Sequence, residues 1–369
     1  MRRRLFAAIA LTLVATAVPV SAEAGRSTLQ RDADGIVATG VTGVLARETS
    51  PHGSRTAVSG VQVRPDGRFR IGSTNKVLVG TVVLQLVAEG RMRLDDSVEK
   101  WLPGRTAGTE YNGRKITVRQ LLQHTAGISD ESFPNIESAQ QYYERRYLVH
   151  TEEAIVQAGL KNQPTFPPGK GWSYSNTGYD LVGLVIQAVT GRTWYDEVDR
   201  RIVRPLHLRD TYFPRTDPRI AGPHARGYTR FTAGEYTDTT DVIDADASGG
   251  YISTLKDLDR ILRSIFDGRL LAPAQLDELT TTVETDETAE LVWRNPRYGL
   301  GVFSRDLPCG GRVWIPGGDQ IGFKTRAAVS ADGRRSVVVS MSTQLYDSMD
   351  ALLAQEKAAS KLIDEVMCR

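Results

Sequence analysis

A hydrophobic segment of helical length without a polar stripe sets the strongest limit on the fold of this chain. It runs from Val77 to Ala88, and only Gly80, Thr81 and Gln85 interrupt it. A helix on the surface of a domain carries a polar face, whereas a helix that is apolar nearly all round is buried. We therefore predict a helix through the centre of a large domain, for which a 369-residue chain is long enough.

Predicted strands lie at both ends of the chain, and predicted helices lie between them. Alternating apolar residues favour strands over 43–48, 56–63, 68–71, 298–305, 312–315, 323–330 and 335–342. Helical periodicity covers 27–36, 117–124, 138–148, 151–159, 176–189, 254–266 and 349–366. This order predicts an α+β fold, with an antiparallel sheet built from both termini, flanked by helices, and a mostly helical inserted domain. We assign residues 25–95 and 285–369 to a sheet subdomain and 96–284 to a helical subdomain.

A serine and a lysine stand at the start of the predicted buried helix. Ser73 and Lys76 are three residues apart, so both project from one face of its N-terminus. A serine there lies beside free backbone N–H groups and the positive end of the helix dipole, which favour developing negative charge. A partly desolvated Lys76 could accept the serine proton or, as a cation, stabilise the alkoxide. The alternative is that Ser73 only caps the helix.

The Ser-x-x-Lys spacing occurs three times, so it is weak evidence by itself. One copy begins at Ser97, among acidic residues typical of a solvated surface. Another begins at Ser253, where Ser253 or Thr254 is typical of a helix cap. Only the copy at Ser73 precedes a helix that we expect to be buried.

A second motif, Trp-Ser-Tyr-Ser-Asn-Thr-Gly-Tyr at 172–179, precedes another apolar helix. Tyr174 and Asn176 are two residues apart, so an extended turn can direct both into one cleft. A tyrosine beside a lysine can relay protons, and an asparagine amide can both donate to and accept from a peptide-like substrate. The alternatives are a packed aromatic ring and a helix cap.

The sequence contains no motif for nucleic-acid binding, for other kinds of hydrolase, or for metal or phosphate binding. With 46 Lys and Arg against 44 Asp and Glu, the net charge of +2 provides no basic field for nucleic acid. No histidine lies in a Gly-x-Ser-x-Gly motif, no His, Cys and Asp cluster has zinc spacing, and no phosphate loop precedes a helix. The acidic run of Asp238, Asp241, Asp244 and Asp246 lacks calcium-loop spacing, and we predict a solvated lip. We expect no metal, no cofactor, and a small-molecule or peptide substrate.

The N-terminus has the pattern of a secretory signal peptide over residues 1–24. Three arginines at 2–4 precede an apolar stretch over 5–20, and Ala-Glu-Ala at 22–24 fits the cleavage pattern. The apolar stretch is shorter than the roughly 20 residues of a membrane-spanning helix, so cleavage is favoured over an anchor. We expect a secreted protein that begins near Gly25 and has no stable membrane anchor.

Export bears on the two cysteines of the chain, Cys309 and Cys368. An oxidising compartment permits a disulfide, and an exported chain has few reasons to keep free thiols. We therefore expect these two residues to pair, and two unrelated buried thiols are the alternative.

Four short motifs follow one another along the chain. They lie at 73–76 (Ser-Thr-Asn-Lys), 121–127 (Leu-Leu-Gln-His-Thr-Ala-Gly), 174–176 (Tyr-Ser-Asn) and 246–253 (Asp-Ala-Ser-Gly-Gly-Tyr-Ile-Ser). Together they resemble the serine beta-lactamase and D-alanyl-D-alanine carboxypeptidase superfamily, especially class C beta-lactamases and exported carboxypeptidases. The resemblance implies the same fold, with Ser73 as the acylated nucleophile, Lys76 as its activator, Tyr174 as the proton shuttle and Asn176 as a substrate-amide contact. It also implies that His124 packs at a helix end and takes no part in catalysis.

A further motif of that superfamily, Lys or His, then a variable residue, then Gly, aligns here with Pro316, Gly317 and Gly318. The basic side chain is therefore missing, while the glycine and the backbone are kept. The resemblance still implies substrate binding at Gly318 and Asp319, with an oxyanion hole made by the backbone N–H groups of Ser73 and Asp319.

Lys324 or Arg326 could replace the missing cation, or could be exposed strand charges without a role.

We predict a serine hydrolase that works through an acyl-enzyme, resembling a D-alanyl-D-alanine carboxypeptidase that acts on peptidoglycan peptides. A beta-lactamase or a small-ester hydrolase is the alternative within the superfamily. A non-catalytic binder of penicillin or peptides is the alternative from another class, because the missing cation is compatible with lost turnover.

Overall fold

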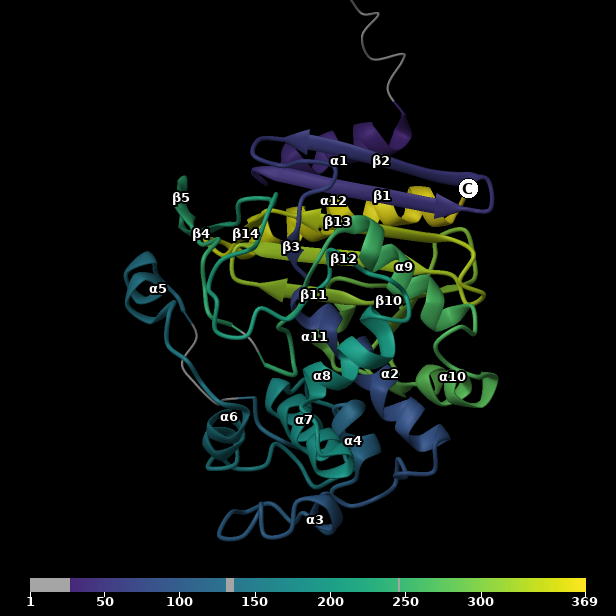
Figure 1. The fold of residues 1–369 in the computed structure, drawn as a ribbon. Coiled ribbons are helices and arrows are strands. Elements are labelled where there is room, and N and C mark those ends of the chain that lie inside the picture. The colour runs from purple at the N-terminus through teal and green to yellow at the C-terminus, as the bar shows by residue number, and fades with distance from the viewer. Residues whose placement is uncertain (1–26, 131–135, 245) are drawn as a thin grey trace, which may run out of the picture.

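The computed structural model of the protein describes residues 27–130, 136–244 and 246–369; the predicted signal peptide at 1–24 lies outside them. Strands from both ends of the chain form one main sheet (Figure 1). Its order is β2 (Gly53–Gly60), β1 (Gly43–Ser50), β13 (Ser336–Met341), β12 (Phe323–Val329), β10 (Arg312–Ile315), β9 (Phe303–Asp306), β8 (Arg297–Tyr298) and β7 (Val283–Glu284). Strand β11 (Gly317–Gln320) pairs with β12 outside this path.

The centre of this sheet joins the two termini. Strand β1 runs antiparallel to β13, with Val44 opposite Met341. Helices α1 (Thr28–Val37) and α12 (Met349–Met367) pack together against one face of the sheet, where they share a hydrophobic core with Val44 and Ala46 of β1. Helix α9 (Leu255–Phe266) packs on the opposite face, against β13 and β1. The predicted α+β fold is confirmed.

Helices dominate the middle of the chain, below the sheet in Figure 1. They are α2 (Asn75–Ala88), α3 (Val98–Trp101), α4 (Val118–Leu122), α5 (Ala139–Arg145), α6 (Glu152–Gly159), α7 (Asn176–Thr190), α8 (Trp194–Val198), α10 (Pro273–Thr280), α11 (Glu287–Glu290) and the single turns η2 (Gly72–Thr74) and η3 (Asp199–Val203). The small sheets consist of β3 (Phe69–Arg70) with β6 (Ile252–Ser253), and β14 (Thr343–Leu345) with β4 (Tyr228–Thr232) and β5 (Glu235–Asp238). Helix α2 is the apolar segment noted above, and its residues from Asn75 to Leu84 are all buried.

Some predicted elements differ from the observed ones. The predicted strand at 298–305 is two short strands, β8 and β9, because the chain turns back between them at Gly299 to Val302. Gly301 has a φ of +99°, and a Cβ atom there would lie 2.5 Å from the carbonyl oxygen of Lys76, so this turn requires glycine. The predicted helix at 138–148 ends earlier, at Arg145.

Cys309 and Cys368 form a disulfide, with their Cα atoms 5.8 Å apart. The bond ties the turn between β9 and β10 to the end of helix α12. Among the described residues, no helix has both the length and the apolar character needed to cross a membrane.

Replacing both cysteines (Cys309→Ser with Cys368→Ser) is expected to lower the free energy of unfolding by about 2 to 5 kcal/mol. The reason is that the bond closes a loop between residues 59 positions apart, which restricts the unfolded chain. Urea unfolding of the oxidised protein, the reduced protein and the double variant measures the effect. Equal midpoints for all three would contradict it.

Candidate active site

Ser73 lies in the single turn η2, which connects strand β3 to the buried helix α2. The N-cap position of α2 is Thr74, and no side chain caps that helix end. Instead, Ser73 Oγ accepts a hydrogen bond from Lys76 Nζ at 3.1 Å. The alternative that Ser73 serves as a helix cap therefore does not describe this structure. At the other two Ser-x-x-Lys sites the hydroxyls of Ser97 and Thr254 cap helices, which was expected at Thr254 and not foreseen at Ser97.

Lys76 is 1% exposed and has three hydrogen-bond acceptors around its Nζ atom. Besides Ser73 Oγ, these are Asn176 Oδ1 at 2.6 Å and the carbonyl oxygen of Ser248 at 2.9 Å. An ammonium group has three N–H donors and no acceptor, so this surrounding fits the protonated lysine. The geometry therefore favours the second of the two predicted roles, a cation beside the serine oxygen.

Tyr174 lies between Lys76 and His124, in the extended segment before α7. Lys76 Nζ is 4.8 Å from the centroid of the Tyr174 ring, and the centroid of the His124 ring is 4.4 Å from the same point. His124 Nδ1 accepts a hydrogen bond from the backbone N–H of Ser175 at 3.1 Å, so its Nε2 carries the proton and donates to Tyr298 Oη. Burial, with the charge of Lys76, lowers the pKa of His124 well below its usual value, which keeps the ring neutral. His124 thus supports the segment that carries Tyr174.

Asp130 is a site residue that the sequence reasoning missed. Its Oδ1 accepts from the backbone N–H of Asn176, and its Oδ2 accepts from Asn176 Nδ2 at 3.1 Å. These bonds fix the amide so that Oδ1 faces Lys76. Among the described residues, no acceptor pairs with the second N–H of this amide. No spacing in the sequence relates Asp130 to Asn176, because the two lie 46 positions apart.

Strand β11 places Gly318 and Asp319 against the backbone of Ser73. A Cβ atom on Gly318 would lie 2.5 Å from Ser73 N, so only glycine permits this approach. Pro316 O accepts from Ala327 N. In an antiparallel ladder, the backbone N–H and C=O groups of successive residues point alternately towards the partner strand and away from it. The backbone groups of Gly318, like those of Pro316, therefore point towards β12, while the N–H of Asp319 points to the opposite edge of β11, where Ser73 lies. The two N–H groups predicted for the oxyanion hole are thus on neighbouring backbone segments.

The two candidates for the missing cation, Lys324 and Arg326, belong to a buried ion network. Both contact Glu356 of helix α12 and Asp319, with the Lys324–Glu356 pair at 2.7 Å and the Arg326–Asp319 pair at 2.6 Å. The alternative of exposed strand charges is wrong, since their side chains are 2% and 12% exposed. Asp319 is the most exposed member at 36%. Burial alone would raise the pKa of Asp319, but the charges of Arg326 and Lys324 outweigh it and lower the pKa to about 2.

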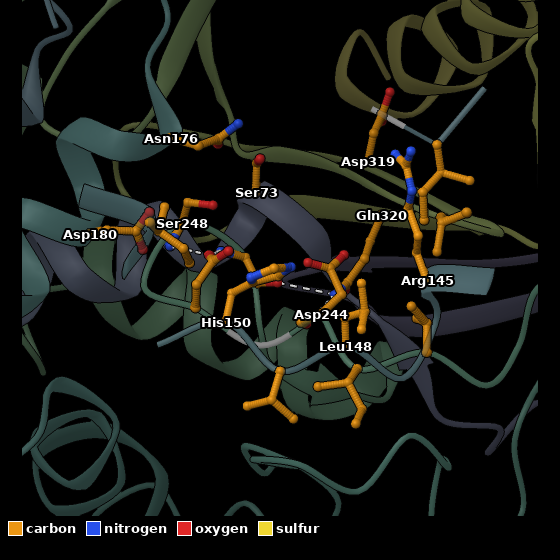
Figure 2. A pocket seen from close by; sticks show the side chains of 18 of the residues that line it. Ser73, Arg145, Leu148, His150, Asn176, Asp180, Asp244, Ser248, Asp319 and Gln320 are labelled. Carbon is orange, nitrogen blue, oxygen red and sulfur yellow. Dashed lines mark hydrogen bonds between the residues drawn. The ribbon is translucent and has the colours of Figure 1, made fainter. Parts of the chain in front are cut away.

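A cavity of about 1400 Å³ opens at Ser73, and carboxyl groups lie on its walls (Figure 2). They include Glu152 of α6, Asp180 of α7, and Asp244 and Asp246 from the loop before β6. The predicted solvated lip is therefore wrong for Asp244 and Asp246, which are half-buried in the cavity wall. This loop is buried by helices and loops that lie far from it in the sequence, so its own sequence does not indicate its burial. In the described part of the chain no group of His, Cys, Asp and Glu residues could hold a metal ion.

This fold, with a serine and a lysine hydrogen-bonded at the start of a buried helix, defines the protein as a serine hydrolase of the beta-lactamase fold. The chain belongs to the Beta-lactamase family, whose family model matches residues 17–361. A curated relative, penicillin-binding protein 4* of Bacillus subtilis, is 25% identical over 295 residues, which are 75% of this chain and 61% of that protein. The match thus spans less than two thirds of that relative.

Two solved structures extend this comparison. A D-stereospecific amidohydrolase from Streptomyces sp. is 36% identical, with a TM-score of 0.81 over 89% of this chain and 97% of that chain. The D-amino acid amidase from Ochrobactrum anthropi SV3, in complex with L-phenylalanine amide, is 24% identical, with a TM-score of 0.77 over 92% and 97%. At that lower identity, the second structure shows the shared fold alone.

Proposed function

We propose that this protein is an exported, D-stereospecific amide hydrolase that forms an acyl-enzyme on Ser73. The observation that carries the proposal is the hydrogen bond of Ser73 Oγ to a buried lysine, beside two backbone N–H donors. The 36% identity to a D-stereospecific amidohydrolase over nearly its whole length supports the choice of substrate. Export rests on the pattern of residues 1–24 and agrees with the disulfide.

In the proposed reaction, Ser73 Oγ attacks the amide carbon, and the carbonyl oxygen becomes an oxyanion held by the N–H groups of Ser73 and Asp319. The hydroxyl proton of Ser73 passes to Tyr174 Oη, while the phenol proton passes to the leaving nitrogen. The C–N bond breaks, the amine leaves and an ester on Ser73 remains. Water then attacks this ester, and the same relay in reverse returns a proton to Ser73. The ammonium of Lys76 stabilises negative charge on the serine oxygen throughout.

The charges at β11 argue for a leaving group without a free carboxylate. Pro316 stands where the superfamily has a basic residue, and Lys324 and Arg326 are already paired with Glu356 and Asp319. Asp319, the most exposed member of this network, presents a carboxylate to the cavity. A terminal carboxylate on the leaving residue would find no unpaired cation at β11, because the two cations of this network are already paired with two carboxylates. We therefore place an amide substrate ahead of the D-alanyl-D-alanine carboxypeptidase substrate predicted from the sequence.

Comparing kcat/KM for four substrate classes tests the proposal. They are D- and L-phenylalanine amide, an acyl-D-alanyl-D-alanine peptide, a chromogenic cephalosporin and a p-nitrophenyl ester. We expect the D-amide to exceed the L-amide and the D-alanyl-D-alanine peptide by about tenfold or more, a difference of about 1.4 kcal/mol. Faster cleavage of the peptide would favour the carboxypeptidase, and faster cleavage of the cephalosporin or ester would favour the other two hydrolases. Acylation of Ser73 without turnover of any substrate would favour the non-catalytic binder.

A further inference from the structure

Two backbone segments pack directly against the turn that carries Ser73. One is β11, because a Cβ atom on Gly72 would lie 2.7 Å from the carbonyl oxygen of Asp319. The other is the loop before β6, described at 244 and 246–249, which we call the Ser248 loop. A Cβ atom on Gly249 of this loop would lie 3.3 Å from Ser73 N. At such distances no side chain separates the backbones, so the positions of both segments determine the surroundings of the serine.

Each segment also contributes one group to the predicted acylation step. Strand β11 presents the N–H of Asp319, which is predicted for the oxyanion hole. The Ser248 loop presents the carbonyl oxygen of Ser248, which accepts from Lys76 Nζ at 2.9 Å and so helps to keep the ammonium beside the serine. The two groups can act on one serine only if the strand and the loop keep a fixed spacing.

Gln320 connects the two segments. It is the last residue of β11, directly after Asp319, and it is 5% exposed. Its Nε2 atom donates to the carbonyl oxygens of Asp244 at 2.7 Å and Gly249 at 3.1 Å, so both N–H groups of the amide bind the loop. Among the described residues, no other hydrogen bond joins β11 to the Ser248 loop. Figure 2 shows Gln320 pointing towards Asp244 and away from Asp319.

The oxygen of this amide indicates that packing alone does not account for a glutamine here. Oε1 of Gln320 is buried and has no hydrogen-bond partner in the described structure, which costs free energy. An apolar side chain of similar length, such as methionine, would fill the same space without this cost. The reversed amide orientation is also unfavourable, because Oε1 would then face two carbonyl oxygens. The two bonds to the loop are therefore what an amide contributes at this position.

We propose that Gln320 is a positioning residue, which fixes the Ser248 loop against β11 so that the Asp319 N–H and the Lys76 ammonium act on the same serine. This inference rests on the acyl-enzyme at Ser73, which is part of the proposed function, and it is independent of the choice of substrate. Gln320 itself transfers no proton.

The effect of losing this connection falls on the chemical step. Negative charge develops on the substrate oxygen in the transition state, so displaced donors lower kcat more than they raise KM. Loss of one whole oxyanion-hole donor lowers kcat by about 10²- to 10³-fold, and a displaced donor costs less. We therefore expect a loss of about tenfold or more when Gln320 can no longer bind the loop.

Gln320→Met tests the role of the amide, because it removes both donors and keeps the length of the side chain. Measured well below its Tm, its kcat for D-phenylalanine amide should fall by about tenfold or more, a change of about 1.4 kcal/mol in activation free energy, while KM stays within about twofold. The rate of Ser73 labelling by a fluorophosphonate should fall as well, because the serine attacks with the same groups in place. An unchanged kcat, or a loss confined to KM, would overturn the inference.

Gln355→Met is the matched control. Gln355 is also a buried glutamine whose Nε2 donates to a backbone carbonyl, that of Thr343 at 2.7 Å, and whose Oε1 has no partner among the described residues. It lies on α12, outside the cavity. Both substitutions exchange a buried amide for an apolar side chain, so we expect similar changes in Tm, with a fall in kcat and labelling rate in Gln320→Met alone. An equal loss of kcat in the control would refute a specific role for Gln320.

Hydrogen exchange tests the position of the loop without any substrate. The backbone N–H groups of Ser248 and Gly249 donate to Asp246 Oδ1 at 2.8 Å and 3.1 Å, and such bonds slow exchange while the loop is fixed. A peptide that covers 246–253 should therefore exchange faster in Gln320→Met than in the wild type or in Gln355→Met. Equal exchange of this peptide in all three proteins would contradict the connection.

The outcomes separate this inference from the proposed function. If the wild type hydrolyses no amide but a fluorophosphonate still labels Ser73, the substrate class is wrong and the labelling rates still test Gln320. If the wild type is neither active nor labelled, acylation at Ser73 fails, and the catalytic role of Gln320 fails with it.

Gln320→Asn provides a second variant in case Gln320→Met does not fold. It keeps an amide, but its side chain is one methylene too short to reach both carbonyl oxygens of the loop. We expect the same fall in kcat and the same faster exchange of the 246–253 peptide. A folded Gln320→Asn with the full wild-type kcat would overturn the inference.

Discussion

Ser73→Ala is expected to abolish turnover, with a loss of kcat on the order of 10⁴-fold or more, and to prevent covalent labelling by a fluorophosphonate. The hydroxyl is the only group of this residue that can form the acyl-enzyme, and Lys76 alone hydrogen-bonds to it in the described structure. Since Ser73 does not cap helix α2, its removal should change Tm by no more than a few degrees. Intact-protein mass spectrometry after labelling, followed by peptide mapping, measures both outcomes.

Ser97→Ala is the matched control, because Ser97 begins another Ser-x-x-Lys spacing and only caps helix α3. It should keep its labelling and its activity, and lose about 1 kcal/mol of stability at most as a lost cap. Labelling that maps to a residue other than Ser73, or that survives in Ser73→Ala, would refute the assignment of the nucleophile.

Tyr174→Phe should slow acylation by on the order of a hundredfold or more if Tyr174 Oη carries the proton from Ser73. The aromatic ring, which packs between Lys76 and His124, is kept by this substitution, so the loss would report on the hydroxyl alone. The rate of Ser73 labelling by a fixed concentration of a fluorophosphonate, followed by mass spectrometry, measures how fast the deprotonated serine oxygen attacks an electrophile, which is also the first step of acylation.

Tyr179→Phe is the control for this experiment. Its ring is also near Lys76, at 5.2 Å from Nζ, but its hydroxyl donates to the carbonyl oxygen of Leu122 at 2.8 Å, away from the reaction. We expect the control to lose some stability and to keep its labelling rate within a few fold. An unchanged rate in Tyr174→Phe would return Tyr174 to a packing role.

The local parts of the site could be predicted from the sequence, because short spacings determine them. Ser73 and Lys76 are on one helix face, and Tyr174 and Asn176 share one extended turn, so their neighbourhoods follow from residue periodicity. The apolar content of α2 likewise indicated its central position.

The long-range parts could not be predicted in this way. Whether Lys324 and Arg326 are exposed depends on Glu356, which a separate helix brings to their side of the sheet. Asp130 acquires its role from Asn176, and Gln320 holds the backbone of Asp244 through its carbonyl oxygen; both partners lie far along the chain. A charged side chain in a polar stretch is usually solvated, so its burial became visible only when the covering elements were in place.

The pairing of β1 with β13 has a consequence for how the protein is made. Val44 can pair with Met341 only after nearly the whole chain has been synthesised. Strand β1 therefore cannot take its place beside β13 while the chain is still growing. Contacts between such distant segments slow folding, because the entropy of closing a long loop must be overcome first. Asp319, whose backbone N–H is predicted to form part of the oxyanion hole, also comes late in the chain. We therefore expect the growing chain to have no hydrolase activity until its C-terminal strands have been synthesised and have joined the sheet.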